Sequence, residues 1–523
     1  MAVDTLTFGA LSAVYLAITL ALGYLGYRRT RHAEDYMVAG RKAQPLVLAL
    51  SYGASFISTS AIVGFGGAAA VYGMGLIWLT VLNIGLGIFI AFTVFGKRIR
   101  AIGKELGAVT FPDLMGKRYR SGFLQYASAL LILAGMPLYA AAILIGGAQF
   151  LAIALSIPYV WALVIFAAIT AVYVVFGGLI AVMYAGAFQG AVMLAGMSLL
   201  LIFTYLAIGG VVPGNQALTD MGSAVPQTLA AMGHTGWTSM PAPGSEIWFT
   251  LVTTLVLGVG IGVLAQPQLT VRLMAAKDSR TLNRAVAVGG LFILVMTGGA
   301  FTVGALSNVY FYYHDSPGGQ IALQAAGNNI DRIIPIFIEH AMPSWFIVVF
   351  LLTLLAAAMS TLSSLFHAMG TAIGYDLWQH LKDRKPSLAA NRAGIVVMIV
   401  VSGVLALVMP GSIIARATAM FFGLCASALL PAFAYGMFSE KPVAVAAKAS
   451  LLTGAVVWFL WTAFVHKAES SVLGFSQVLF GKATLLGFPW NVIDPLVIAL
   501  PLAVLVLAVI TVRVHRRDAA GSG

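Results

Sequence analysis

Long apolar runs dominate this sequence, and they restrict how it can fold. Residues 6–27, for example, carry no charged side chain. A helix needs about 20 apolar residues to cross the hydrocarbon core of a bilayer, and this rule predicts about 13 transmembrane helices. They lie near residues 6–27, 45–72, 75–96, 121–153, 159–178, 181–211, 247–268, 283–308, 333–378, 393–410, 412–438, 443–466 and 493–515. Because 333–378 is too long for one span, we expect a separate interfacial helix ending near Pro343.

Charged residues make up only 9% of the chain, while 60% of residues are hydrophobic. A soluble domain carries about 25% charged residues, so we predict an all-α integral membrane protein. The net charge of +12 does not indicate a nucleic-acid partner, because the basic residues fall between the apolar runs. The single cysteine, Cys425, excludes an intramolecular disulfide framework and a cysteine metal cluster.

The positions of Lys and Arg predict how the chain is oriented. Alternate loops hold 25 of the 29 basic residues; these loops are 28–42, 97–120, 272–284, 382–392, 441–448 and 513–517. The opposite loops hold only Arg332, Arg416, Lys467 and Lys482. Cytoplasmic loops are enriched in Lys and Arg. We therefore expect a multi-pass protein of the plasma (inner) membrane with an extracytoplasmic N-terminus and a cytoplasmic C-terminus.

The acidic residues indicate what kind of ion the membrane region could bind. All 17 fall in predicted loops or near the ends of spans. A proton-driven carrier usually needs an ionisable relay within the membrane, and His367 is the one obvious candidate. This favours an ion held by neutral oxygens, namely backbone carbonyls and hydroxyl groups, which suit a small hard cation.

Two apolar segments contain Gly, Ser and Pro patterns that would interrupt a helix. They are SYGASFISTSAIVGFGG at 51–67 and LGVGIGVLAQPQ at 257–268. Secondary transporters form ion and substrate sites from broken helices at matching positions of two inverted repeats. The five-span spacing predicts repeats at 45–211 and 247–438, an extra first helix at 6–27 and two final helices within 443–515. We expect one membrane transport domain, 1–518, and assign no role to the tail, 519–523.

Four hydroxyls lie within five positions of the ninth predicted span, in AAMSTLSS. Ala357 to Thr361 and Ser360 to Ser364 are i,i+4 pairs, so these residues share one helix face. The face could meet the break in the second span. Taken alone, such hydroxyls favour ordinary hydrogen bonding between membrane helices over an ion site, and His367 likewise favours a packing role.

Several stretches resemble the sodium/solute symporter family, which includes the sodium/proline, sodium/galactose and sodium/sialic acid symporters. The likeness runs through most of the chain and is densest in five motifs. They are DYMVAGRKAQPLVLALSYGAS (35–55), TFPDLMGKRYR (110–120), YVVFGGLIAVMYAGAFQG (173–190), AQPQLTVRLMAA (265–276) and AAMSTLSS (357–364). The resemblance implies a LeuT-like fold, and it turns the preference at the hydroxyl cluster towards a sodium site.

That resemblance implies one Na+ site between the second and ninth spans. Its ligands would be the carbonyls of Ala54, Ile57 and Ala357 and the hydroxyls of Ser360 and Thr361. Ser363 and Ser364 resemble hydroxyls of a second sodium site in some members. Those members have an aspartate where this chain has Gly186. We therefore expect one coupled sodium ion and a packing role for Ser363 and Ser364.

The expected substrate pocket departs from the known members of this family. Phe56 stands where proline symporters have aspartate, and Val259 and Val263 replace Trp and Tyr, so proline is disfavoured. Ser60 and Ala61 replace the Glu and Gln of the galactose carrier, so a sugar is disfavoured too. A small monocarboxylate or a neutral amino acid would suit what remains, with monocarboxylate preferred. The candidate substrate-binding residues are Phe56, Thr59, Ser60, Phe65, Val259, Val263 and Gln266.

We thus predict sodium-coupled symport of a small organic solute by alternating access. The partners are sodium, the solute and the lipid bilayer; neither a nucleic acid nor an obligatory protein partner is implied. A proton-coupled carrier of the same fold is the closest alternative, with His367 as its relay. A membrane sensor is less expected because no cytoplasmic domain follows Arg517. An enzyme is disfavoured because the spans lack a Ser/His/Asp set, an H-E-x-x-H motif or paired carboxylates.

Overall fold

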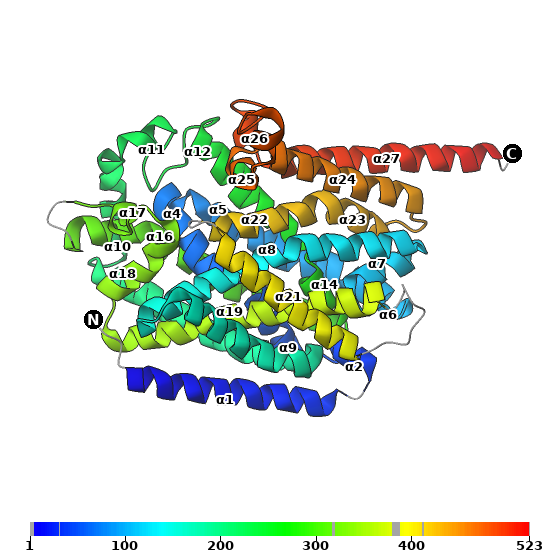
Figure 1. Cartoon of the computed structure of the whole chain (residues 1–523), viewed down its shortest axis with the longest axis horizontal. Helices are drawn as coiled ribbons and strands as arrows, with labels where there is room; N and C mark the ends of the chain where they lie inside the picture. The colour runs from blue at the N-terminus through cyan, green and yellow to red at the C-terminus, as the bar shows by residue number, and fades with distance from the viewer. Residues whose placement is uncertain (1–4, 31, 316–318, 379–387, 410–412, 522–523) are drawn as a thin grey trace.

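The computed structural model describes residues 5–30, 32–315, 319–378, 388–409 and 413–521, and these are folded into a bundle of helices (Figure 1). Eleven of the described helices are long and apolar enough to cross a membrane. Two shorter apolar helices, Pro45–Phe56 and Tyr159–Ala171, belong to the second and fifth predicted spans. The predicted all-α membrane class is confirmed.

The first half of the bundle contains the second to sixth predicted spans. Its α-helices are α3 (Pro45–Phe56), α4 (Phe65–Tyr72), α5 (Ile77–Leu82), α6 (Lys97–Glu105), α7 (Phe111–Tyr119), α8 (Gly122–Leu155) and α9 (Tyr159–Ala207). The π-helical segments η2 (Ser60–Gly64) and η4 (Asn83–Gly96) and the 3-10 segment η3 (Gly73–Leu76) continue them. Helix α9 holds two spans, separated where Gly178 adopts φ 61°, a conformation that favours glycine.

The second half contains the seventh to eleventh predicted spans. Its α-helices are α12 (Glu246–Phe249), α13 (Val259–Gly262), α14 (Pro267–Met274), α15 (Ser279–Ile293), α16 (Gly299–Tyr310), α18 (Ile333–Ala341), α19 (Ser344–Thr371), α21 (Leu388–Val408), α22 (Ile414–Leu424) and α23 (Leu430–Phe438). They are joined by the π-helical segments η6 (Thr250–Gly258), η8 (Leu294–Gly298), η9 (Phe311–Asp315), η11 (Ala372–Leu377) and η12 (Cys425–Leu429), and by the 3-10 segments η7 (Val263–Ala265) and η10 (Ile330–Arg332). Helix α18 ends before Pro343, as expected for the start of the overlong segment.

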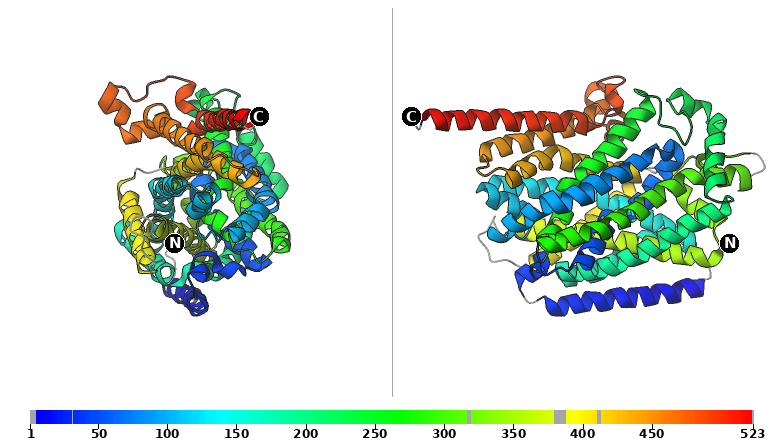
Figure 2. Two further views of the ribbon diagram at one scale, coloured as in Figure 1. Left: turned by 90° about the vertical axis from the view of Figure 1, so that its right-hand side faces the viewer. Right: turned by 180° about the vertical axis from the view of Figure 1, so that it is seen from behind.

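The remaining helices flank the two halves or lie in the connections. They are α1 (Thr5–Arg29), α2 (Ala33–Val38), α10 (Val211–Asp220), α11 (Gln227–Ala231), α17 (Ala322–Ala325), α24 (Ala444–Phe464), α25 (Lys467–Leu473), α26 (Phe475–Phe480) and α27 (Pro495–Gly521). Helix α1 lies on the opposite side of the bundle from α24 and α27 (Figures 1 and 2). Figure 1 also shows α2, α6 and α7 at the end of the molecule where α27 ends, and α10, α11 and α17 at the other end. The basic helices α6 and α7 and the basic end of α27 thus lie at one end, and the connections that contain α10, α11 and α17 lie at the other.

Both predicted helix interruptions are present. Helix α3 ends at Phe56, and Ile57 has extended backbone angles before the chain becomes helical again. In the seventh span, Gln266 is extended between η7 and α14, and Pro267 begins the new helix. Proline suits this position because its missing N–H would be unpaired in a first helical turn.

The connection between α9 and α12 packs onto the end of α4. Trp237 is fully buried, and its indole Nε1 donates to the carbonyl of Ala70 at 2.8 Å. Asn308 Nδ2 donates to the same carbonyl at 2.8 Å, and His234 Nε2 lies 3.0 Å from the carbonyl of Val71. Because the last carbonyls of a helix have no partner within it, these side chains complete the end of α4.

Candidate functional site

The break after α3 leaves backbone carbonyls free of helical hydrogen bonds. Ile57 still donates its N–H to the carbonyl of Gly53, but its own angles, φ −93° and ψ 120°, end the helical ladder. Backbone groups that lose their helical partners inside a membrane need another partner from the protein or a cavity. For the carbonyls of Ala54 and Ile57, that partner comes from α19.

Five oxygens, from α3, from Ile57 just after it and from α19, meet at this break. Ser360 Oγ donates to the carbonyl of Ala54 at 2.7 Å and is 3.0 Å from that of Ala357. Thr361 Oγ1 lies 3.1 Å from the carbonyl of Ala54 and 3.3 Å from that of Ile57. None of these residues is more than 1% exposed. The structure therefore brings together the oxygens of all five residues expected to bind sodium.

The chemistry of this oxygen cluster fits a monovalent cation. All five residues are uncharged, so an ion held there would gain no fixed counter-charge from them. Each hydroxyl has one proton and two lone pairs and can rotate. A rotated hydroxyl would turn a lone pair into the cluster while the carbonyls already point there. Among the described residues, no group of three or more His, Cys, Asp or Glu side chains could form a metal site of another kind.

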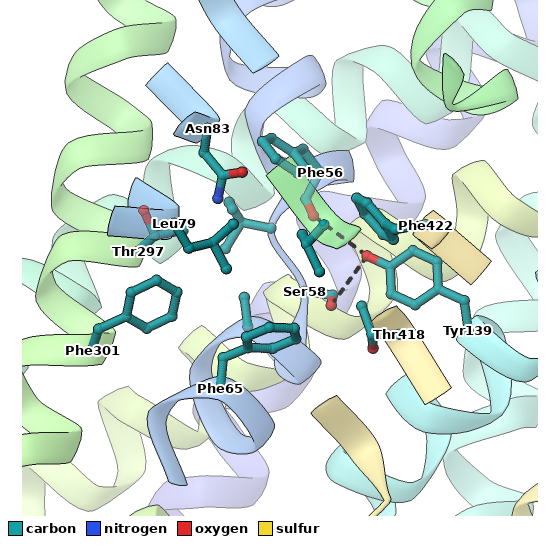
Figure 3. A pocket seen from close by; sticks show the side chains of 13 residues that line it. Phe56, Ser58, Phe65, Leu79, Asn83, Tyr139, Thr297, Phe301, Thr418 and Phe422 are labelled. Carbon is teal, nitrogen blue, oxygen red and sulfur yellow. Dashed lines mark hydrogen bonds between the residues drawn. The ribbon is translucent and has the colours of Figure 1, made fainter. Parts of the chain in front are cut away.

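A small cavity lies beside the helix break (Figure 3). Its free volume is about 20 Å³, and a cavity needs roughly 10–15 Å³ on this measure to hold one water molecule. An organic solute therefore requires its walls to move. The lining residues are Phe56, Ile57, Ser58, Ala61, Phe65, Leu79, Asn83, Tyr139, Val259, Thr297, Phe301, Thr418 and Phe422.

Aromatic rings form much of the cavity wall. Phe56 stacks on Phe422 with 6.3 Å between ring centroids, and Phe65 lies 6.3 Å from Phe301. Tyr139 packs edge-on against Phe422, and its hydroxyl is 3.4 Å from both the Phe56 carbonyl and Ser58 Oγ (Figure 3). The wall is apolar apart from neutral polar groups, and no charged side chain is among the lining residues.

Three of the seven expected substrate residues, Phe56, Phe65 and Val259, line the cavity. The other four lie outside its lining. Thr59 Oγ1 donates to the carbonyl of Ile143 at 3.2 Å, and the Ser60 hydroxyl is buried without a hydrogen-bond partner. Val263 is buried, and the Gln266 side chain accepts from Gln268 Nε2 at 2.8 Å.

Sequence reasoning missed the polar groups of the cavity that come from other helices. Asn83, in η4, has a buried Oδ1 without a hydrogen-bond partner. Thr297 and Thr418 instead donate to carbonyls of their own helices, at 2.8 and 2.9 Å. A single polar residue in an apolar segment has no periodic signal, so nothing in the sequence distinguished these three from lone packing residues.

Ser363 and Ser364 make helix-packing hydrogen bonds. Ser363 Oγ donates to the carbonyl of Ser360 at 2.9 Å. Ser364 Oγ lies 2.7 Å from that carbonyl and 2.8 Å from Ser55 Oγ of α3. The latter contact joins α3 and α19 one turn beyond the oxygen cluster.

Arg272 requires a correction to the sequence analysis. The sequence places it among the basic residues of the loop 272–284, but it lies in α14 and is only 1% exposed. The predicted span ended at 268, whereas the helix resumes at Pro267 and runs to Met274. The distribution of charges between apolar runs could not show that the second half of this broken span is inside the protein.

His367 is buried and bonded to the backbone. Its Nε2 lies 3.1 Å from the carbonyl of Tyr36 and therefore donates to it. The ring also packs against that of Tyr36, with 5.5 Å between centroids. Through these contacts His367 packs α19 against α2.

Comparison with known proteins decides what kind of protein has this site. The model of the sodium:solute symporter family matches residues 36–454. The chain belongs to the sodium:solute symporter family. The match includes both broken helices and the oxygen cluster, so this member is a sodium-coupled solute symporter and a transporter rather than an enzyme. The predictions of symport, of sodium as the coupled ion and of a membrane location are thereby confirmed.

Similar proteins cover nearly the whole of this symporter. The sodium/pantothenate symporter of Haemophilus influenzae is 27% identical over 86% of this chain and 89% of its own length. The sodium/proline symporter of Escherichia coli is 25% identical over 86% of this chain and 87% of its own length.

Solved structures support the predicted fold. The substrate-bound, outward-open structure of a Na+-coupled sialic acid symporter superposes with a TM-score of 0.71 and 18% identity, covering 96% of this chain and 97% of that one. The closed structure of the nucleobase-cation-symport transporter Mhp1 gives 0.51 and 16% identity, covering 91% and 95%. The LeuT-like five-plus-five fold class is therefore confirmed.

Proposed function

We propose that this symporter moves a small monocarboxylate or a neutral amino acid into the cell together with one sodium ion per cycle. The observation that carries the proposal is the meeting of five neutral oxygens, at the break after α3 and on α19, beside a small and mostly apolar cavity. Ala54, Ile57, Ala357, Ser360 and Thr361 are the proposed ligands. The resemblance described above implies this set, and the measured distances support it.

The chemistry of the cavity supports a solute of this class. Broken helices offer unpaired N–H groups that attract a carboxylate, while apolar pockets with few polar groups suit a small apolar body. Asn83 adds an unpaired amide oxygen that a neutral donor could reach. The relatives named above are symporters of pantothenate and proline, and both solutes carry a carboxylate.

Coupling follows from the position of the proposed sodium site. A cation bound between α3 and α19 would hold the two helices together and favour one arrangement of the broken span. Ligand and ion binding are then linked because each favours the same conformation. An inside-negative potential supplies about 2.3 kcal/mol per charge per 100 mV for inward movement. Alternating access would expose both to the cytoplasm for release.

The proposed orientation puts the basic end of the molecule in the cytoplasm. This end contains α2, α6, α7 and the end of α27 (Figure 1). Positive-inside asymmetry is the support for it, and the plasma (inner) membrane is the proposed location.

Thermal unfolding of the purified protein in sodium chloride, potassium chloride and choline chloride tests the sodium site. A ligand at 100 times its Kd stabilises the folded state by about 2.7 kcal/mol. We expect a sodium-specific rise in Tm that the double variant Ser360→Ala/Thr361→Ala loses. Ser363→Ala is the matched control, because its hydroxyl bonds only within α19. An equal Tm in all three salts, or an undiminished sodium response in the double variant, contradicts the proposed site.

Uptake into proteoliposomes then identifies the solute. We expect short monocarboxylates or neutral amino acids to accumulate under an inward sodium gradient, and not under a proton gradient alone. Uptake driven equally well by protons would favour the proton-coupled alternative and direct attention to His367.

A further inference from the structure

Arg272 is a buried cation beside the proposed sodium site. Its Nη1 donates to the carbonyl of Gln268 at 2.9 Å, and its Nη2 donates to Ser364 Oγ at 2.6 Å. Its Nε is buried without a hydrogen-bond partner. The guanidinium has five N–H groups, so it retains donors for a further acceptor.

A guanidinium cannot lose its proton in a protein, and a buried charge needs a counter-charge. In the parts of the chain that the structure describes, the ion pairs are Arg41–Glu34, Lys117–Asp113, His340–Asp315 and His466–Glu469. None includes Arg272. Its position in the last turn of α14 offers the negative end of a helix dipole, but that end carries only a partial charge.

The contact with Ser364 places the guanidinium close to the cation site. Ser364 lies one turn after Ser360 on α19 and donates to the Ser360 carbonyl. The same hydroxyl accepts from Arg272 and from Ser55 of α3. When sodium occupies the oxygen cluster, the sodium ion and the Arg272 guanidinium would be two positive charges close together. Their separation would be no more than about two helical turns, at a rise of about 1.5 Å per residue. A negative charge beside the guanidinium N–H groups that lack an acceptor would favour both.

We propose that Arg272 is the binding point for a small monovalent anion, held through its free guanidinium N–H groups next to Ser364. Chloride and the carboxylate group of a small organic acid share the required chemistry, since guanidinium groups bind carboxylates strongly. If the anion is a carboxylate, the proposal rests on the proposed function, because the carboxylate would belong to the transported solute on its way through the protein. If the anion is chloride, the proposal does not depend on the proposed function.

Unfolding of the purified protein at constant sodium concentration and ionic strength tests this proposal. Sodium HEPES, whose anion is bulky, serves as the reference, and sodium chloride, acetate and propionate are the test salts. We expect a saturable rise in Tm with the binding anion. A response to chloride alone identifies chloride, and a larger response to acetate or propionate identifies the carboxylate source.

Three variants make the test specific. Arg272→Met removes the cation and should abolish the anion response. Ser364→Asp places a fixed carboxylate at the guanidinium and should also abolish the anion response. Ser364→Asn introduces a neutral side chain of the same size as aspartate and should retain the response. If Arg272→Met does not fold, comparing Ser364→Asp with Ser364→Asn still tests whether the anion binds at Arg272. Equal Tm values in all four salts, or an undiminished anion response in Ser364→Asp, would overturn the proposal.

The sodium response is measured separately, by comparing sodium HEPES with potassium HEPES. If Tm rises with sodium but with no anion, the proposed sodium site is supported and the proposed anion site is contradicted. If Tm rises with chloride but not with sodium, the anion site is supported and the sodium site is contradicted.

Discussion

Single glycines determine how closely the helices of this symporter approach one another. A Cβ atom added at Gly304, in α16, would lie 2.0 Å from the carbonyl oxygen of Gly66 in α4. Close backbone approach through small residues is a common way of packing membrane helices. The contact joins the second half of the broken second span, near the start of α4, to the eighth span.

Gly304→Ala is therefore expected to destabilise the protein by about 1–3 kcal/mol, as other overpacking substitutions do. The added methyl group meets backbone, which cannot move aside as a side chain can. Thermal unfolding in detergent at fixed sodium concentration measures the effect.

Gly290→Ala, in α15, is the matched control. A Cβ there has no atom within 4 Å, so the substitution should be neutral or should stabilise by up to about 1 kcal/mol through helix propensity. Equal losses of Tm in both variants would contradict the packing explanation.

At the scale of residues, the sequence predicted which oxygens meet, including those of Ser360 and Thr361, better than it predicted which residues line the cavity. Hydroxyls at helical spacing and a Gly- and Ser-rich break leave a local pattern, which alone favours helix packing, and the family resemblance is what turns it towards a sodium site. Asn83 and Thr418 leave none, because only tertiary packing brings η4 and α22 to the same cavity. Arg272 was misplaced for a similar reason, since burial of a basic side chain depends on neighbours far along the chain.

At the scale of elements, the packing of the α9–α12 connection onto α4 introduces a pH-sensitive group. His234 Nδ1 accepts from the N–H of Gly236 at 3.1 Å, so its Nε2 donates to the Val71 carbonyl. Burial lowers the pKa of His234. Protonation at Nδ1 would also remove the acceptor that holds Gly236.

The protein is consequently expected to lose stability as pH falls. An unfolded histidine has a pKa of about 6.5, and the folded value is lower. Below about pH 6.5 the unfolded state therefore binds more protons than the folded state, and the free energy of unfolding decreases as pH drops. Tm measured between about pH 5 and pH 8 follows the change.

His234→Gln should reduce this pH dependence, because an amide can donate to Val71 and accept from Gly236 without titrating. Identical pH profiles for the variant and the parent protein would show that His234 does not contribute.

Helix interruptions were predictable because Gly and Pro mark them, as at Gln266 and Pro267. The π-helical segments were not. The longest, η4, covers 14 residues of an apolar run, and nothing in that run distinguishes a π-helix from an α-helix. The packing of the α9–α12 connection onto α4 was equally unpredictable, since Trp237 meets Ala70 across 167 residues of chain.

At the scale of the whole molecule, the separation of basic and non-basic loops predicts which end a reagent can reach. Gln216 in α10 and Lys104 in α6 are exposed at opposite ends of the bundle (Figure 1). Cys425 is buried and should not interfere with labelling.

We expect a membrane-impermeant maleimide to label Gln216→Cys in intact cells and Lys104→Cys only after the membrane is opened. The parent protein, with Cys425 alone, is the control for background. The reverse labelling pattern would show that the orientation is inverted.

The global architecture could be predicted because two independent signals agree on it. Apolar lengths and the five-span spacing of the two helix interruptions predicted the spans and their repeats, and the family resemblance implied the same LeuT-like fold. Neither signal gives the distance between the repeats or the state of the cavity, which depend on side-chain packing throughout the bundle.

The oxygen cluster also has a consequence for the order in which the protein is made. Thr361 bonds to the carbonyl of Ala54 across 307 residues of chain. Ribosomes add about 5–20 residues per second, so roughly 15–60 s separate the synthesis of the two halves of the cluster. During that interval the break after α3 is already in the membrane without its partner. The early helices must therefore remain inserted with the proposed sodium site incomplete, because a nascent chain that stops before α19 lacks the hydroxyls of Ser360 and Thr361.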